Sequence, residues 1–261
     1  MKRFIAVIFF VLFVIVLPAE SNEDISHEIA SVFKDWSLTV GGGILYQPEY
    51  QGSRDMEVIF LPVFTPIYKN FLYVSPMGGG VYFPIYKNKI IGKAGLGYDL
   101  FKISGERVLM GLSDREDGII LDGEVRFNFH KNYTAAIIAR KVFWGSDSLH
   151  VEGRLGARYA VTDKLTISFG AHATFGDSKY MRFKFGITRE QSAISGFEEY
   201  EPGAAFKSVG GEIAFRYALS KEITLAAVHS ETMLLKQALK SPTTFRQRQP
   251  RTFLTITYSF R

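Results

Sequence analysis

The sequence predicts an all-β fold: an antiparallel transmembrane β-barrel of about twelve strands, within a range of about ten to fourteen. Three observations predict it. Apolar and polar residues alternate through one segment after another, an apolar leader opens the chain, and alternating aromatic residues close it. Alternation gives each strand one apolar and one polar face. A soluble β-sandwich shows the same pattern, but the length and number of the segments, the leader and the last strand favour the barrel.

The first residues have the features of a secretory signal peptide. Lys2 and Arg3 precede an apolar stretch at 4–17, and Ala19 and Ser21 form a small-x-small cleavage site. The alternative is a membrane anchor, but this stretch is shorter than the ~20 residues that a spanning helix needs. We therefore expect a cleaved signal peptide over 1–21, a short periplasmic segment over 22–35, and an outer-membrane barrel over 36–261.

Composition narrows the class further. The chain has no cysteine, which suits passage through an oxidising periplasm, and its net charge is +5 without a basic cluster that would indicate nucleic acid. After the leader no apolar run is long enough for a spanning helix. A membrane-embedded mature chain must then be a closed barrel, because lipid cannot satisfy an open sheet edge.

The pattern places the strands in the following order, with boundaries good to a few residues. They are 36–46, 56–68, 71–86, 89–101, 119–129, 133–143, 150–161, 164–175, 179–187, 205–219, 222–235 and 252–260. The third strand contains Gly78, Gly79 and Gly80, and would become two strands if it broke there. An even count places both chain ends in the periplasm of a Gram-negative cell.

The connections are of two kinds. Most are short, polar and typical of hairpins. Three are long, at 102–118, 188–203 and 236–251. This strand count predicts the last two outside the cell and 102–118 in the periplasm, where its mixed charges make it a candidate docking loop.

The polar face is charged, and charges pointing into hydrocarbon near the midplane would cost about 2–4 kcal/mol each. We therefore expect these side chains in the lumen, where they either fill the barrel as ion pairs or form a constriction that selects ions or small solutes. The residues are Glu124, Arg126, Glu152, Arg154, Arg158, Arg182, Lys184, Glu212 and Arg216.

The last strand alternates Leu254, Ile256, Tyr258 and Phe260 with small polar residues. It resembles the C-terminal strand that the outer-membrane assembly machinery recognises in its clients. Tyr258 and Phe260 are the expected assembly signal, although Arg261 follows where such strands usually stop.

Three further segments, in this order and spacing, resemble the MltA-interacting protein family (MipA/OmpV) of Gram-negative outer membranes. The resemblance covers nearly all of the mature chain and implies structural roles for the matched residues in turns and rigid loops. They are Pro48, Tyr50, Gly52 and Ser53, then Gly186, Gln191, Ser192 and Gly196, and finally Ser241 and Pro242.

The resemblance implies a non-enzymatic scaffold for peptidoglycan enzymes, with a lytic transglycosylase and a peptidoglycan synthase as partners besides outer-membrane lipids. The alternatives are a narrow pore and a lipid-modifying enzyme. His229, Ser230 and Glu231 have residue types of a hydrolase triad, but in a strand Ser230 points away from the other two. We expect no catalytic residue, no cofactor and no metal, because the histidines lack metal-ligand spacing.

Overall fold

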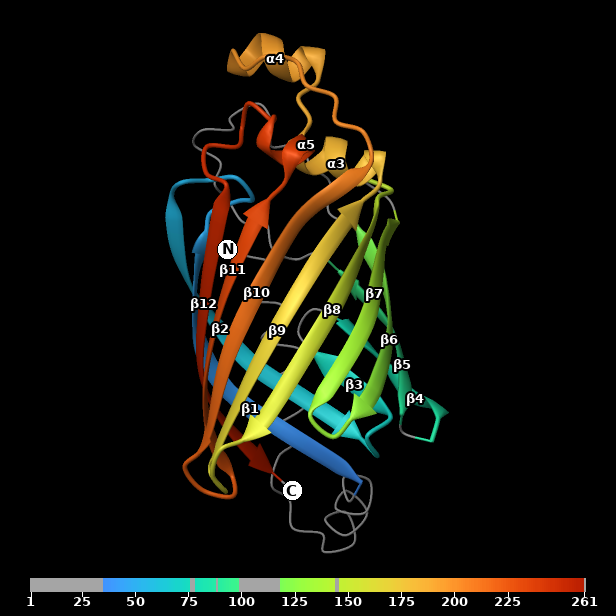
Figure 1. Ribbon diagram of the computed structural model, residues 1–261, viewed down its shortest axis with the longest axis vertical. Coiled ribbons are helices and arrows are strands. Elements are labelled where there is room, and N and C mark those ends of the chain that lie inside the picture. Colours follow the sequence, from blue (N-terminus) through green and yellow to red (C-terminus); the bar gives the residue numbers. More distant parts are fainter. Residues whose placement is uncertain (1–34, 76–77, 88, 99–117, 144–145, 261) are drawn as a thin grey trace, which may run out of the picture. The chain divides into compact units, whose positions relative to one another are not determined.

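The computed structural model describes residues 35–75, 78–87, 89–98, 118–143 and 146–260. They form one closed antiparallel barrel in which each strand pairs with its sequence neighbours and β12 returns to β1 (Figure 1). The predicted barrel of twelve strands is therefore confirmed. The strands are β1 (Trp36–Pro48), β2 (Met56–Tyr68), β3 (Leu72–Ser75), β4 (Gly78–Tyr86), β5 (Ile90–Tyr98), β6 (Ile119–His130), β7 (Tyr133–Phe143), β8 (Leu149–Ala160), β9 (Leu165–Gly176), β10 (Ala205–Ala218), β11 (Ile223–Leu234) and β12 (Arg248–Phe260).

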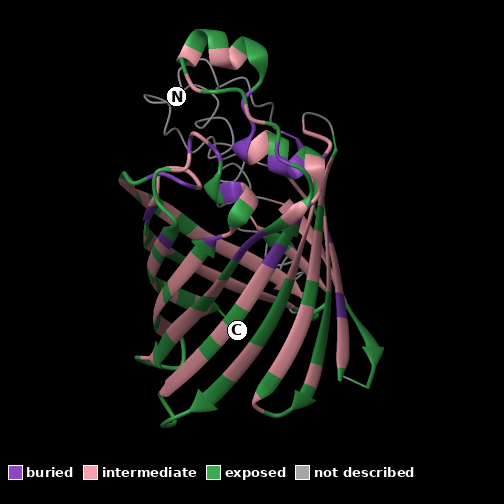
Figure 2. Cartoon of the chain, turned by 45° about the horizontal axis from the view of Figure 1, so that its top comes forward, coloured by how far each residue is buried: buried purple, intermediate pink, exposed green. Residues whose placement is uncertain are grey.

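The outer wall of the barrel is apolar. Phe60 on β2 is 76% exposed, Ile137 on β7 63% and Leu155 on β8 62%, and the alternate residues of these strands are less exposed (Figure 2). An apolar surface this extensive suits hydrocarbon, and a closed ladder leaves no strand edge that lipid would have to satisfy. The wall is that of a membrane-spanning barrel.

Two of the twelve predicted strands are wrong, and the errors cancel in the count. The segment 71–86 is two strands, because the chain reverses before the glycine run and Ser75 pairs with Gly78. Gly78 has a φ of +147°, and a Cβ there would lie 2.2 Å from the carbonyl oxygen of Leu96. This backbone conformation suits only glycine.

The second error concerns 179–187, which is mostly helix α3 (Ser178–Phe185) and not a strand. Asp177 caps the helix, since its carboxylate accepts the N–H of Tyr180 at 2.6 Å. This local cap outweighs the alternation that suggested a strand. Among the residues that the structure describes, no helix is long and apolar enough to cross a membrane.

The split also corrects the expected sides of the connections. With β3 and β4 as separate strands, β5 runs in the same direction as β9 and β11. Tyr98 at the end of β5 and Ile119 at the start of β6 therefore lie at the same barrel end as the connections after β9 and β11, and not at the opposite end as the sequence suggested. Most of 102–118 lies outside the described residues, as do the leader 1–21, the segment 22–34 and Arg261.

The seam between β2 and β3 is short. β3 has four residues and pairs with β2 only through Ile67 with Tyr73 and Tyr68 with Leu72. The carbonyl of Ile67 accepts a hydrogen bond from the Ser37 hydroxyl of β1 at 3.5 Å, so it points toward β1. Backbone groups of successive strand residues point to opposite sides, so those of Pro62 and Pro66 point toward β3. Proline has no N–H to donate, which suits an edge that β3 does not cover.

Phe169 lies near the middle of β9 and is 49% exposed on the wall, whereas its neighbour Ser168 is less exposed and belongs to the opposite face. Phe169→Arg should lower the free energy of unfolding by about 2–4 kcal/mol, because the charge would enter hydrocarbon. Ser168→Arg should be tolerated far better. Urea titration of both variants folded into lipid vesicles measures the difference, and equal losses would contradict a lipid-facing Phe169.

Candidate functional site

The barrel end from which the connections after β9 and β11 leave carries a folded cap. It contains α3, α4 (Arg189–Ser195) and α5 (Lys236–Leu239), and in Figure 2 the buried residues gather there. Among the residues that the structure describes, this is the one cluster of buried apolar side chains that pack against one another. Its members are Tyr180, Met181, Phe185, Leu234 and Ala238.

The first family-like segment contacts the connection between β11 and β12, which contains the third. The N–H of Gly52 donates to Oε1 of Gln249 at 3.0 Å, and its carbonyl accepts the N–H of Phe245 at 2.8 Å. Gly52 has a φ of +105°, and a Cβ there would lie 2.9 Å from Oγ1 of Thr244. Only glycine fits both the backbone conformation and the close approach.

The second and third motifs also meet. The Ser241 hydroxyl, which is buried, donates to the carbonyl of Phe185 at 2.6 Å. The Tyr200 hydroxyl donates to the carbonyl of Gln237 at 2.7 Å. These bonds tie the connection after β9 to the connection after β11, although the two are far apart in sequence.

The other motif residues shape the cap locally. Pro48 ends β1, and burial raises the pKa of the Tyr50 phenol beside it. The buried Ser53 hydroxyl donates to the carbonyl of Asp55 at 3.1 Å. Gly186 ends α3, where a Cβ would lie 2.5 Å from the carbonyl oxygen of Arg182.

Helix α4 is defined by its own ends. Gln191 and Thr188 form a reciprocal capping box, and Gly196 closes the helix with a φ of +75°. The Ser192 hydroxyl donates to the carbonyl of Phe197 at 2.6 Å. Pro242 occupies the turn that follows Ser241. Apart from Pro48, the last residue of β1, all the residues that the family resemblance singled out thus belong to the cap.

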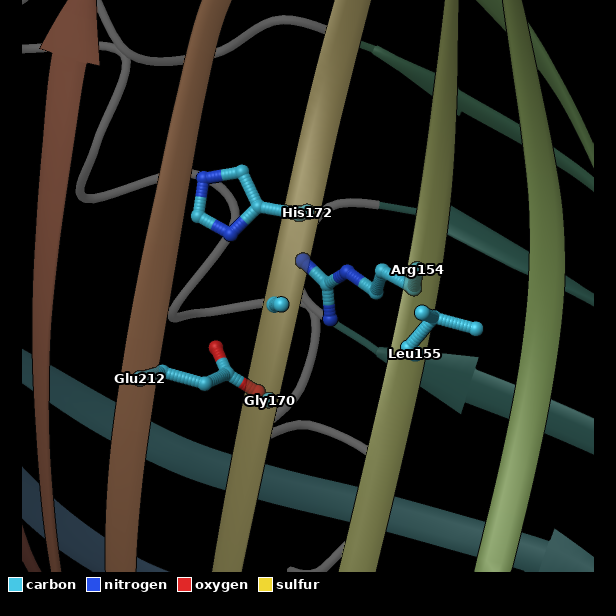
Figure 3. A pocket seen from close by; sticks show the side chains of 6 residues that line it. Arg154, Leu155, Gly170, His172 and Glu212 are labelled. Carbon is cyan, nitrogen blue, oxygen red and sulfur yellow. The ribbon is translucent and has the colours of Figure 1, made fainter.

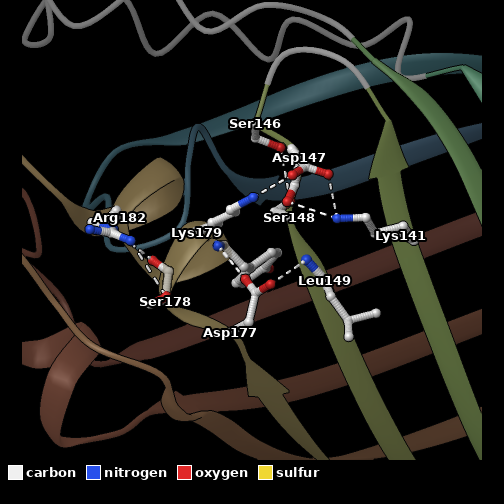
Figure 4. A network of polar contacts seen from close by, with 10 residues as sticks. Lys141, Ser146, Asp147, Ser148, Leu149, Asp177, Ser178, Lys179 and Arg182 are labelled. Carbon is white, nitrogen blue, oxygen red and sulfur yellow. Dashed lines mark hydrogen bonds and ion pairs between the residues drawn. The ribbon is translucent and has the colours of Figure 1, made fainter.

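Ion pairs join the cap to the rim of the barrel (Figure 4). Asp177 accepts the N–H of Leu149 at 3.1 Å in addition to capping α3. Asp147 lies between Lys141, at 2.5 Å, and Lys179 of α3. The hydrogen bonds from Lys141 and Lys179 lower the pKa of the Asp147 carboxyl to about 2.

The charges predicted for the lumen are found in three settings. Glu124 pairs with Arg126 at 2.6 Å on β6, and Glu152 pairs with Arg154 on β8. Figure 3 shows Arg154 and Glu212 reaching toward each other beside Gly170, together with His172.

The other two predicted strand arginines lie nearer the barrel end with the short turns. In the strand register Arg158 stands opposite Ser168, and Arg216 stands opposite Thr166.

The prediction that Arg182 and Lys184 face the lumen from a strand is wrong. Both lie on α3, because the expected strand is a helix, so neither takes part in the strand alternation. Arg182 is exposed and pairs with Glu201 at 2.5 Å.

Several further charged groups lie on the same face, and the alternation of the strands could have predicted them. Lys93 pairs with Asp122 at 3.1 Å and lies over the ring of Tyr73. Arg140 and Arg251 follow from the register, because they stand opposite Asp122 and Ser230. Over the described strands, basic side chains on this face outnumber acidic ones.

The triplet 229–231 does not assemble. His229 is exposed beside Thr252, with Nδ1 2.9 Å from its Oγ1, and Glu231 pairs with Arg248. Ser230 stands opposite Glu212 on the other face of the strand. In the described part of the chain, no group of three or more His, Asp and Glu side chains could hold a metal ion.

Gly52→Ala should loosen the cap without opening the barrel. A side chain at positive φ costs about 1–2 kcal/mol, and the contact with Thr244 adds to it. Trypsin cleavage of the folded protein at Lys240 and Arg246 should become several-fold faster. Gly203→Ala is the control, because nothing lies within 4 Å of its Cβ position. Unchanged cleavage would contradict the role of Gly52.

The Asp147 bridge should make the cap sensitive to acid. A pKa lowered to about 2 in the folded state means that the bridge stabilises the cap above the unfolded pKa of ~3.9 and is lost as the pH falls through about 2. Hydrogen exchange of the α3 amides should accelerate between about pH 4 and pH 2 beyond the intrinsic change. In Asp147→Asn this step should be missing, whereas in the distant Asp163→Asn it should persist.

The comparisons with known proteins identify a family. Solved structures similar to the chain include a KdgM porin (9% identity, 85% of this chain and 99% of that chain, TM-score 0.43) and a NanC porin (10%, 85% and 98%, TM-score 0.45). Another is the outer membrane channel DcaP of Acinetobacter baumannii (10%, 86% and 96%, TM-score 0.41). No curated protein matches the sequence. The family model of MltA-interacting protein MipA matches residues 40–260, so the chain belongs to the MipA family.

Proposed function

We propose that this protein is an exported outer-membrane barrel that acts as a scaffold for cell-envelope enzymes. The observation that carries the proposal is the family match over 40–260, because the family is described as MltA-interacting. The expected partner is a lytic transglycosylase of the MltA type, together with a peptidoglycan synthase. The leader supports export with cleavage after Ser21. An N-terminus at Asn22 in the mature protein would be the direct evidence for this step.

The orientation follows from the two barrel ends. Outer-membrane barrels keep short turns in the periplasm and longer connections outside. By this rule the cap is extracellular, and the turns after β2, β4, β6, β8 and β10 face the periplasm. The connection 102–118 then belongs to the extracellular end, so it no longer serves as the docking loop for a periplasmic enzyme.

The periplasmic turns offer a different docking surface. Each of these turns carries an exposed lysine, either within the turn or at the residue next to it. Lys69 and Asn70 have φ values of 48° and 55°, the left-handed conformation of a tight two-residue hairpin, which holds the lysines on short, ordered turns. This basic turn surface suits a partner with an acidic face. It consists of Lys69, Lys87, Lys89, Lys131, Lys164 and Lys221.

A pore is the second candidate, because the polar face of the wall is charged and predominantly basic. If the barrel conducts, its current in a planar bilayer should prefer anions. We propose no enzymatic activity, since the triplet 229–231 is divided between two faces of the wall.

The triple charge reversal Lys69→Glu, Lys131→Glu and Lys221→Glu should weaken capture of an MltA-type transglycosylase at least tenfold in low salt. The matched control reverses three exposed charges of the cap end, Arg189, Lys236 and Lys240, and changes the net charge equally. Surface plasmon resonance with the barrel in nanodiscs measures both. Equal binding by the two variants would contradict the basic turn surface, and no binding by the unmodified barrel would favour the pore.

A further inference from the structure

Polar atoms without partners gather under the cap. In the described residues, three buried side-chain atoms have no hydrogen-bond partner: Oε1 of Gln51, Nδ1 of His150 and Oγ of Ser208. They come from the connection after β1, the start of β8 and the start of β10. Buried polar atoms are rarely left unpaired, and all three residues lie at the cap end of the barrel, so a ligand or water that pairs these atoms is expected there.

A β-bulge brings a lysine to the same place. Phe206 pairs with Phe175 and Ser208 with Thr174, which leaves Lys207 as the extra residue of β10. Phe206 is 60% exposed on the outer wall, whereas Lys207 is 8% exposed and Ser208 1%. The bulge therefore turns two consecutive side chains inward, which regular alternation does not allow.

The aromatic ring of Tyr180 forms the centre of the group. Nζ of Lys207 lies 3.4 Å from its hydroxyl, and the ring of His150 lies 4.8 Å from its ring. The side chain of Gln51 also interacts with this hydroxyl and lowers its pKa. Burial raises the pKa of the Tyr180 phenol, but the positive charges of Lys207 and Lys184 outweigh it, so the pKa is lower than usual.

The lysine has no carboxylate partner in the part of the chain that the structure describes. A buried ammonium without an anion is costly. Water could complete the hydrogen bonds of Gln51, His150 and Ser208, but it would not compensate the positive charge. An anion would do both.

We propose that this group of side chains binds a small oxyanion, a carboxylate or a phosphate, whose molecule also carries hydroxyl groups. Lys207 neutralises the charge, and Ser208 and His150 donate hydrogen bonds to the oxygens. Oε1 of Gln51 can only accept, so it takes a hydroxyl of the ligand. The site lies at the cap end, away from the basic turn surface, and is independent of the scaffold proposal.

The test is isothermal titration calorimetry of the full mature barrel in detergent. Three probes separate the chemistries: inorganic phosphate, glucuronate as a hydroxylated carboxylate, and glucose as a neutral control. We expect glucuronate, phosphate or both to bind and glucose not to. Whichever anion binds identifies the group that the site takes. Absence of binding by both anions, or equal binding of glucose, would overturn the proposal.

Two substitutions locate the site. Lys207→Met should weaken anion binding at least tenfold, whereas the exposed Lys240→Met should leave it unchanged. The difference in gel mobility between unheated and boiled samples checks that each variant is folded. If Lys207→Met does not fold, Ser208→Ala should weaken binding several-fold while Lys207→Arg retains it. Unchanged binding in Lys207→Met, or in Ser208→Ala, would place the anion elsewhere and overturn the assignment.

Discussion

Backbone hydrogen bonding in a solvent without hydrogen-bond partners is the constraint on which this structure depends. Hydrocarbon satisfies no N–H or C=O, so the wall must be a sheet closed on itself, and β12 pairs with β1 to close it. Because the sheet is closed, one face of every strand points out of the barrel and the other points into it. Apolar side chains such as Leu254 and Ile256 are exposed outside, while charged side chains lie on the other face, where Glu152 pairs with Arg154.

The same constraint explains where the hydrophobic core lies. A barrel wall that presents its apolar face to lipid cannot also bury it in the middle of the molecule. Apolar burial takes place at the barrel end, between α3, α5 and β11. Residues of the family-like segments hold this cap together. Gly52 bonds to Gln249 of β12, and Ser241 bonds to Phe185 of α3. The most specific part of the sequence therefore encodes the cap, whereas the wall needs only alternation.

The sequence predicted the wall well because its signal is periodic and local. It failed where one local interaction competes with the period. Alternation over 179–187 resembles a strand, but the cap provided by Asp177 makes a helix. The candidate anion site could not be predicted from the sequence, for another reason. Nothing in the sequence shows that Gln51 and Lys207 approach the same ring, because the bulge at Lys207 shifts the phase of β10 and the contact joins distant connections.

The short seam beside β3 has a mechanical consequence. β2 and β3 share two residue pairs, fewer than any other strand pair whose register is described, and Pro62 and Pro66 remove donors from the same edge. Among the strand pairs whose register is described, separating these two would break the fewest backbone hydrogen bonds. Under a pulling force we therefore expect the barrel wall to open at this seam before the other seams of described register.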